Sequence, residues 1–349
     1  MRKIILINLI FSVSVIAQNN LKYAETIKKS ELEKHILILT SDSLQGRETG
    51  KPGQKKAANY IANHFEKIGI PPSVTTTNKY TKRKETSYFQ KFRVKSNRHL
   101  CKCDDCDVDF VRDLLGVKRW IEGENVLGYI EGSDLKEEII VITAHYDHLG
   151  KHDTLIFPGA DDNGSGTAAT LEIARAFMLA KKEGNGPRRS ILIMPVSGEE
   201  KGLLGSKYYT KKPIFPLEKT VANLNIDMIG RIDDWHKDGN YVYLIGSDML
   251  SQELHDISEE VNNKYTNLEL DYTFNQEDDP NRYYYRSDHY NFAKNKIPVI
   301  FYFNGVHEDY HKMTDTIEKI DFEKTKKITQ LIFLTAWDLA NRDERPKLN

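Results

Sequence analysis

Four apolar runs interrupt the polar character of the chain from residue 139 onward. They are Ile139 to Ile142, Ser190 to Val196, Val221 to Ile226 and Ile297 to Phe303. Consecutive apolar residues without alternation are typical of strands that are covered on both faces. The runs therefore predict buried, largely parallel strands in the middle of a domain.

Helical patterns lie between and around these runs. Ser30 and Glu33 form a possible capping box before a short helix that ends near Leu39. Apolar residues three and four positions apart predict longer helices that begin at Pro52 and end before Gly69, and that cover 166–182 and 322–341. Helices that alternate with buried strands indicate an α/β fold with a mixed, largely parallel central sheet flanked by helices.

The stretch from about 73 to 120 has a different composition. It is rich in Thr, Lys, Arg and Asp, and its periodicity is weak until a strand resumes at 125–130. We interpret it as a variable insertion. It holds the three cysteines, Cys101, Cys103 and Cys106, for which a strained disulfide with a spare thiol, free thiols and a metal site all stay open.

The N-terminus has the pattern of a secretory signal. Arg2 and Lys3 precede an apolar stretch from Ile4 to Ile16, and Ala17 suits cleavage. This stretch is shorter than the about 20 residues of a membrane span. Residues 1–17 are therefore predicted to be a signal peptide and 18–349 a single domain, exported to the periplasm or the medium.

Composition narrows the class of partner. The 349 residues are 39% hydrophobic, and 50 basic against 51 acidic side chains leave a formal net charge of -1. A protein that binds nucleic acid through phosphates needs a dominant basic field, which is absent here. The short basic stretch 79–84 is interpreted as a solvated loop, and no nucleic-acid partner is expected.

Five possible metal ligands follow the predicted strands, with one further carboxylate among them. Two histidines and three carboxylates suit zinc, and a carboxylate that bridges would allow two ions to share one water. Each lies at or after the end of a buried run, where open α/β sheets hold their ligands, so we expect the set to converge. The ligands are His145, Asp162, Glu200, Asp227 and His311, and the extra carboxylate is Glu199.

Six segments in order resemble the M28 family of zinc peptidases. They are LQGRETGKPGQKKAANYI (44–61), AHYDHLG (144–150), GADDNGSGTA (159–168), SGEEKGLLGS (197–206), NIDMIG (225–230) and YHKMTDT (310–316). The resemblance extends over most of the chain. It implies the three-layer fold of the zinc exopeptidases, which is similar to that of the phosphorylase/hydrolase proteins, and a cofactor of two Zn²⁺ per chain, with Co²⁺ or Mn²⁺ as other metals that the ligands accept.

The resemblance also implies a role for each motif residue. His145 and Asp227 would hold one zinc ion, Glu200 and His311 the other, and Asp162 would bridge them. Glu199 would be the general base. Asp147 would orient the imidazole of His145, and Tyr310 would hydrogen-bond the developing oxyanion.

Other residues near the motifs have either two alternative roles or no predicted metal role. Asp288 matches part of the family's substrate pocket, although Ser287 or Asp288 could equally be a helix N-cap. Tyr285, within the cluster 283–285, could line the pocket or pack on the core. Four histidines were assigned no metal role: His148, His152, His289 and His307.

These features favour an exported di-zinc exopeptidase that acts on peptides, and among exopeptidases they favour an aminopeptidase. Carboxypeptidase, dipeptidase and deacylase activities use the same ligands and stay open. A glutaminyl cyclase of related fold uses one zinc ion, and a binding module would lose ligands or base, so the complete set disfavours both. The sequence leaves self-association and the residue preference open.

Overall fold

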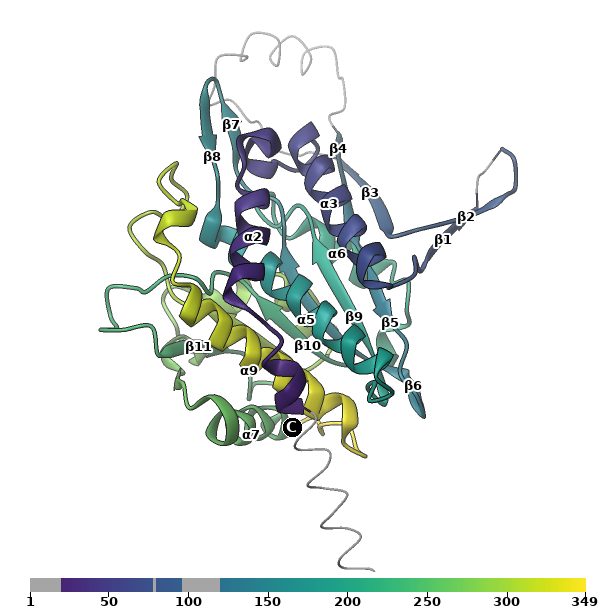
Figure 1. Cartoon of the computed structure of the whole chain (residues 1–349), viewed down its shortest axis with the longest axis vertical. Coiled ribbons are helices and arrows are strands. Elements are labelled where there is room, and N and C mark those ends of the chain that lie inside the picture. Colours follow the sequence, from purple (N-terminus) through teal and green to yellow (C-terminus); the bar gives the residue numbers. More distant parts are fainter. Residues whose placement is uncertain (1–19, 78–79, 96–119) are drawn as a thin grey trace, which may run out of the picture.

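The computed structural model describes residues 20–77, 80–95 and 120–349, and Figure 1 shows their arrangement. The predicted signal peptide (1–17) and the three cysteines, Cys101, Cys103 and Cys106, lie outside the described residues. No helix within the described ranges has both the length and the apolar character needed to cross a membrane.

The described residues form a seven-stranded central sheet with the order β12-β11-β13-β10-β6-β9-β5. The inner strands β13, β10, β6 and β9 run parallel to one another, whereas β5 is antiparallel to β9 and β11 is antiparallel to β13. The mixed, largely parallel sheet is thus confirmed. The strands are β5 (Gly128–Ile130), β6 (Leu135–His145), β9 (Arg189–Val196), β10 (Thr220–Ile226), β11 (Tyr241–Ile245), β12 (Glu269–Asp271) and β13 (Val299–Phe303).

Helices cover both faces of the sheet because its inner strands are apolar on both faces. Ile140 and Ile142 of β6 pack in one core with the helices seen in front in Figure 1, and Ile139 and Val141 pack in a second core behind them. The helices of the first face are α2 (Lys29–Leu39), α3 (Pro52–Ile68), α5 (Gly166–Lys182), α7 (Gln252–Val261) and α9 (Phe322–Asn341), and those of the second are α6 (Leu204–Lys211) and α8 (His289–Ala293).

The predicted helices α3, α5 and α9 are confirmed. The predicted capping box is wrong, although the helix α2 exists. Its N-cap is Lys28, and no side chain caps it. Ser30 already lies inside the first turn, so its hydroxyl is not at the position from which an N-cap accepts backbone N–H groups.

Short strands occupy the ends of the predicted insertion and the loop before Asp162. β1 (Val74–Thr77) and β2 (Lys84–Ser87) form a hairpin that projects from the body, and β3 (Phe89–Lys95) pairs with β4 (Trp120–Val126). β7 (Gly150–His152) pairs with β8 (Leu155–Phe157). β2 is largely exposed, so it lacks the apolar signal that would have predicted it.

Candidate metal centre and active site

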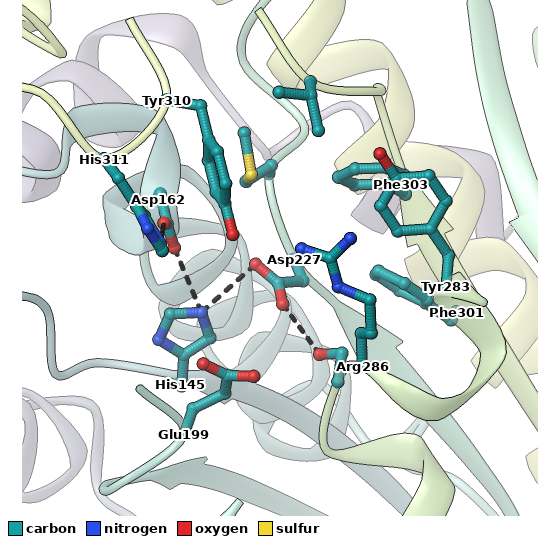
Figure 2. Close-up of a pocket in the computed structure, with 13 residues that line it drawn as sticks. His145, Asp162, Glu199, Asp227, Tyr283, Arg286, Phe301, Phe303, Tyr310 and His311 are labelled. Carbon is teal, nitrogen blue, oxygen red and sulfur yellow. Dashed lines mark hydrogen bonds and ion pairs between the residues drawn. The ribbon is translucent and has the colours of Figure 1, made fainter. Parts of the chain in front are cut away.

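The predicted ligands come together at the carboxyl edge of the four inner strands. His145 is the last residue of β6, Asp227 follows β10 directly, and Glu200 lies in the turn after β9. His311 belongs to the loop after β13, and Asp162 to the turn that leads into α5. The convergence expected from parallel strands is therefore present (Figure 2).

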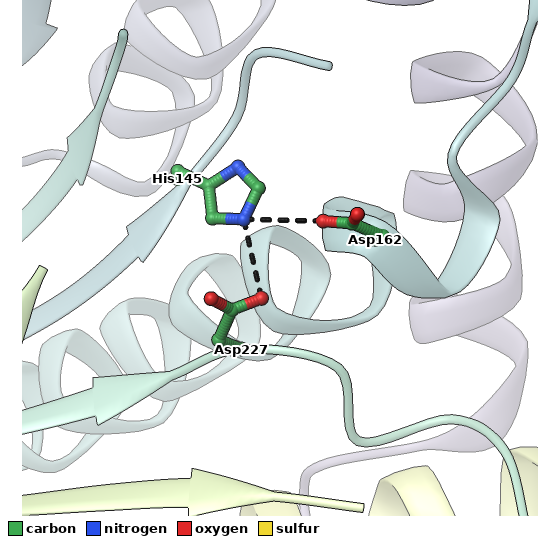
Figure 3. Close-up of side chains that lie close together, drawn as sticks. All are labelled: His145, Asp162 and Asp227. Atoms are coloured by element: carbon green, nitrogen blue, oxygen red, sulfur yellow. Dashed lines mark hydrogen bonds and ion pairs between the residues drawn. The ribbon is translucent and has the colours of Figure 1, made fainter. Parts of the chain in front are cut away.

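One group of donor atoms surrounds the imidazole of His145 (Figure 3). Its Nε2 atom lies 3.2 Å from Asp162 Oδ1 and 3.1 Å from Asp227 Oδ1. All three side chains are buried. Ser287 Oγ donates a hydrogen bond of 2.7 Å to the other oxygen of Asp227, which fixes the orientation of that carboxylate.

A second group surrounds the imidazole of His311. Its Nε2 atom lies 3.2 Å from Asp162 Oδ2 and 3.4 Å from Glu200 Oε2. Asp162 therefore directs one oxygen towards His145 and the other towards His311. This is the geometry that a carboxylate needs to bridge two ions.

The residues present fit zinc at both groups. Zinc with ligands at about 2.0–2.2 Å in a tetrahedron places neighbouring donor atoms about 3.4 Å apart, and the separations around His145 and His311 are 3.1 to 3.4 Å. Imidazole and carboxylate are ligands that zinc accepts. Closely packed buried carboxylates also repel one another, and bound cations would offset this repulsion.

His148, for which the sequence predicts no metal role, joins the second group. The ring is buried, and its Nδ1 atom lies 2.9 Å from Glu200 Oε1 and 3.7 Å from Asp162 Oδ2. Neither ring nitrogen meets hydrogen-bond geometry with another described residue. Its position three residues after His145, at the same strand end, is the signal that could have identified it.

Asp147 connects the first group with Glu199. Its carboxylate accepts a hydrogen bond from Thr49 Oγ1 (2.6 Å) and a longer one from the backbone N–H of Glu199 (3.3 Å). The nearest contact to His145 Nδ1 is the carbonyl oxygen of Asp147 at 3.1 Å, and the carboxylate is 3.8 Å away. The residue thus lies where it can hold both the imidazole and the Glu199 backbone.

Glu199 and Tyr310 line the pocket without belonging to either donor group. Burial raises the pKa of the Glu199 carboxyl well above its usual range. The ring of Tyr310 stacks on His311, with 3.8 Å between centroids, and its hydroxyl points into the pocket in Figure 2. Burial also raises the pKa of Tyr310, so its hydroxyl stays a hydrogen-bond donor.

The turn that presents Asp162 is held by residues outside the donor groups. Asp315 accepts hydrogen bonds from the backbone N–H groups of Asp161 and Asp162, each at 3.1 Å. The Asp161 side chain turns away and accepts from Gly230 N at 2.6 Å, which agrees with Asp162 as the bridging candidate. Gly159 has φ 56°, and a Cβ there would lie 2.1 Å from Asp162 O, so the turn requires glycine.

A buried arginine braces the same turn. Arg47 donates hydrogen bonds to the carbonyl oxygens of Pro158 (2.7 Å) and Gly159 (2.9 Å). It belongs to the early LQGRETG segment, which the sequence linked to the family without a role for this residue. The arginine explains why that distant segment accompanies the ligand motifs.

The two residues for which the sequence analysis raises a substrate role, Asp288 and Tyr285, do not belong to the pocket wall. Asp288 is buried at the N-cap of α8, where its side chain makes no cap hydrogen bond, and Ser206 Oγ donates to it. Burial raises the pKa of Asp288 to about 7. Tyr285 is exposed, and Tyr283 is the member of the tyrosine cluster that lines the pocket. A substrate role for Asp288 or Tyr285 stays a prediction.

Comparisons with known proteins agree with this site. Residues 125–336 match the model of "Peptidase family M28". Aminopeptidase YwaD of Bacillus subtilis is 27% identical over 232 residues, which is 64% of this chain and 46% of that protein. The chain spans about half the length of the curated relatives it matches.

Solved structures share the fold. LapA aminopeptidase of Legionella pneumophila has a TM-score of 0.67 and 22% identity, covering 94% of this chain and 76% of that one. Glutaminyl cyclase of Porphyromonas gingivalis has a TM-score of 0.61 and 18% identity, covering 88% of this chain and 97% of that one. At these identities the likeness concerns the fold, which peptidases and cyclases share.

Proposed function

The chain belongs to peptidase family M28, and from this premise we propose that it is an aminopeptidase that uses two zinc ions to remove residues from peptide N-termini. The observation that carries the proposal is the division of the two Asp162 oxygens between His145 and His311. Such a shared carboxylate serves a pair of ions, whereas a one-metal site has no need of it. The predicted export of the chain is part of the same proposal.

The donor groups define which residues would hold the ions. His145 and Asp227 would hold one, His311 and Glu200 the other, and Asp162 both. Bound zinc lowers the pKa of a water towards neutrality and polarises a carbonyl group. The protein must then supply a proton acceptor, a donor to the oxyanion and a fixed position for the substrate.

Glu199 is suited to accept the proton of the attacking water because it lines the pocket and belongs to neither donor group. The same carboxyl can then pass the proton to the leaving amine. Tyr310 directs its hydroxyl towards the pocket, where it can donate to the oxyanion. Asp147 positions Glu199 through the backbone N–H of that residue.

The direction of cleavage rests on charge and on the relatives. Asp162 and Asp227 would be neutralised by the metal ions, so Glu199 is the carboxylate of the pocket wall that stays free of metal and can attract the ammonium group of a peptide N-terminus. YwaD of B. subtilis is named an aminopeptidase. Removal from the N-terminus is therefore the polarity that we propose.

The test is mass spectrometry of a peptide mixture after incubation with the zinc-loaded protein and its Glu199→Gln variant. We expect stepwise loss of N-terminal residues, blocked by N-acylation, and a rate about 10²- to 10⁴-fold lower in the variant, because the base is lost. Metal analysis should still find two zinc ions in the variant. Glu48→Gln is a matched control, since Glu48 pairs with Lys201 outside the pocket.

The other activities predict different products. C-terminal trimming would reverse the polarity, and loss of ammonia from peptides with N-terminal Gln would indicate a cyclase. Normal turnover in Glu199→Gln would remove Glu199 as the base. Recovery of the processed chain from the periplasm or the medium of expressing cells would test export.

A further inference from the structure

An arginine lies in the same pocket as the acidic site residues. Arg286 lines the pocket together with Asp227 and Tyr283, and Figure 2 shows its guanidinium projecting between those two side chains. The pocket wall beyond it is apolar and aromatic, formed by Met228, Phe301, Phe303 and Val306. Among the described residues that line this pocket, Arg286 is the one lysine or arginine, so it is the side chain placed to bind an anionic group of a substrate.

Arg286 has no carboxylate partner in the part of the chain that the structure describes. Its charge contacts the ring of Tyr283, 4.9 Å from the centroid. Other cations near the site are engaged: Arg231 pairs with Asp309 at 2.9 Å, and Arg47 donates four hydrogen bonds to carbonyl oxygens. Arg286 is exposed and also contacts the hydroxyl of Tyr283, so its guanidinium is open to a ligand that enters from solvent.

The backbone that carries Arg286 is fixed relative to the candidate metal ligands. The next residue, Ser287, donates to Asp227 and accepts from Asn225 Nδ2 at 2.8 Å. The backbone N–H of Arg286 also donates to Tyr283 O at 3.0 Å. The guanidinium is therefore one arginine side chain away from a backbone whose next residue, Ser287, contacts the candidate ligand Asp227. One substrate residue spans a similar distance, so the guanidinium can reach the substrate residue beside the cleaved bond.

We infer that Arg286 binds a carboxylate of the substrate, within one residue of the cleaved bond. The inference rests on the proposed peptidase function and adds a substrate class to it. Guanidinium binds carboxylate through two parallel hydrogen bonds, and the Tyr283 ring orients its plane. The carboxylate belongs either to an acidic N-terminal side chain or to the C-terminus of a dipeptide. In both cases the aromatic wall accommodates the apolar part of the substrate.

The experiment compares matched substrates with the zinc-loaded enzyme. Glutamyl and glutaminyl p-nitroanilides differ only in side-chain charge, and Leu-Gly and Leu-Gly amide differ only at the C-terminus. We expect one pair to show kcat/KM at least about tenfold higher for the carboxylate, the scale of a hydrogen bond to a charged group. Preference within the first pair identifies the side chain, and within the second pair the terminus.

Two variants of Arg286 and one control connect that preference to the guanidinium. Arg286→Gln should reduce the ratio to about one, and Arg286→Lys should retain part of it, because the charge stays but the paired geometry is lost. Arg282→Gln is the control: Arg282 makes the same kind of contact, 4.8 Å from the Tyr285 ring centroid, outside the pocket. Its ratio should equal that of the wild type.

Hydrolysis with ratios near one for both pairs, or a ratio that survives Arg286→Gln, would overturn the inference and leave the proposed function intact. No hydrolysis of any substrate would refute the proposed function instead. Calorimetry with glutamic acid α-amide and glutamine amide then decides the binding question separately. Tighter binding of the acid by wild type, lost in Arg286→Gln, supports recognition of a side-chain carboxylate, and equal binding here together with equal binding of Leu-Gly and Leu-Gly amide contradicts carboxylate recognition altogether.

Discussion

His148 contacts a candidate metal ligand, although the sequence analysis assigns it no metal role. Its Nδ1 lies 2.9 Å from Glu200 Oε1, so it can hold the carboxylate that would bind the second ion. We expect His148→Ala to retain one tightly held zinc ion and to weaken the second by about 10- to 100-fold, the usual effect of losing such a partner. Zinc content after dialysis against graded chelator buffers measures this.

His152→Ala is the matched control for that experiment. His152 is exposed on the β7 strand, four residues further along, and lines no part of the pocket. Two ions held equally tightly in His148→Ala and His152→Ala would show that His148 only packs against the centre.

The sequence identified the five ligand candidates and Glu199 because each has a chemically specific side chain at the end of an apolar run. It held a signal for His148, three residues after His145, but it could not reveal Arg47 or Asp315 in their present roles. Their contribution depends on distances between segments far apart in the chain, such as the 3.1 Å hydrogen bond from Asp162 N to Asp315. Motif patterns record which side chains are present, and these contacts arise only when the turn before α5 is folded.

At the scale of elements, strands were predictable where both faces are buried. The residues of β9 and β10 are buried throughout, which produces a continuous apolar signal. β1 and β2 are mainly exposed, so local pattern could not establish them, whereas β11 is buried throughout and as long as β13, so its apolar run was a signal that the sequence analysis missed. The order of the strands in the sheet could not be predicted either, because the pairing of strands that are distant in the chain is not encoded in the local pattern of apolar residues.

The interface of α2, α3 and α5 carries a pH-dependent contribution to stability. His64 of α3 packs edge to face against His35 of α2, with 4.8 Å between centroids, and lies 3.3 Å from Leu171 O of α5. Glu172 and Arg175 of α5 are the charged neighbours. Burial, followed by repulsion from His35, lowers the pKa of His64 from 6.5 to about 4. The folded state therefore favours the neutral ring.

Between pH 6.5 and 4 the unfolded chain binds a proton at His64 that the folded chain does not, so this contribution is complete above pH 6.5 and is lost as the pH falls. We expect the wild type to lose about 1–2 kcal/mol more unfolding free energy than His64→Leu between pH 7 and pH 5, given about 1.4 kcal/mol per pH unit. Urea denaturation of both proteins at the two pH values, with metal removed, measures the difference. Parallel losses would show that His64 titrates normally in the fold.

At the scale of the whole molecule, the candidate centre connects four strands of the sheet with the turn that leads into α5 of the first helical layer. Its ligands come from the ends of β6, β9, β10 and β13 and from the turn before α5. Ions bound there would link segments from 145 to 311. Their removal would leave closely spaced buried carboxylates with only the site histidines to offset their charge. Metal removal should therefore lower the stability of the entire domain.

We expect exhaustive chelation to lower Tm by on the order of 10 °C, because a ligand at about 1,000 times its Kd contributes about 4 kcal/mol per site. Added zinc should restore Tm with a stoichiometry of two. The change in Tm between the metal-free and the zinc-loaded protein should be as large in Glu199→Gln as in the wild type, since Glu199 belongs to neither donor group. In Asp162→Ala most of this change in Tm should be lost, together with the binding of two ions. Differential scanning calorimetry with metal analysis of the same samples distinguishes the cases. The paired site depends on Asp162, whose two carboxylate oxygens each lie 3.2 Å from an Nε2 atom, one of His145 and one of His311. Two ions still bound tightly by Asp162→Ala would therefore contradict the bridging role.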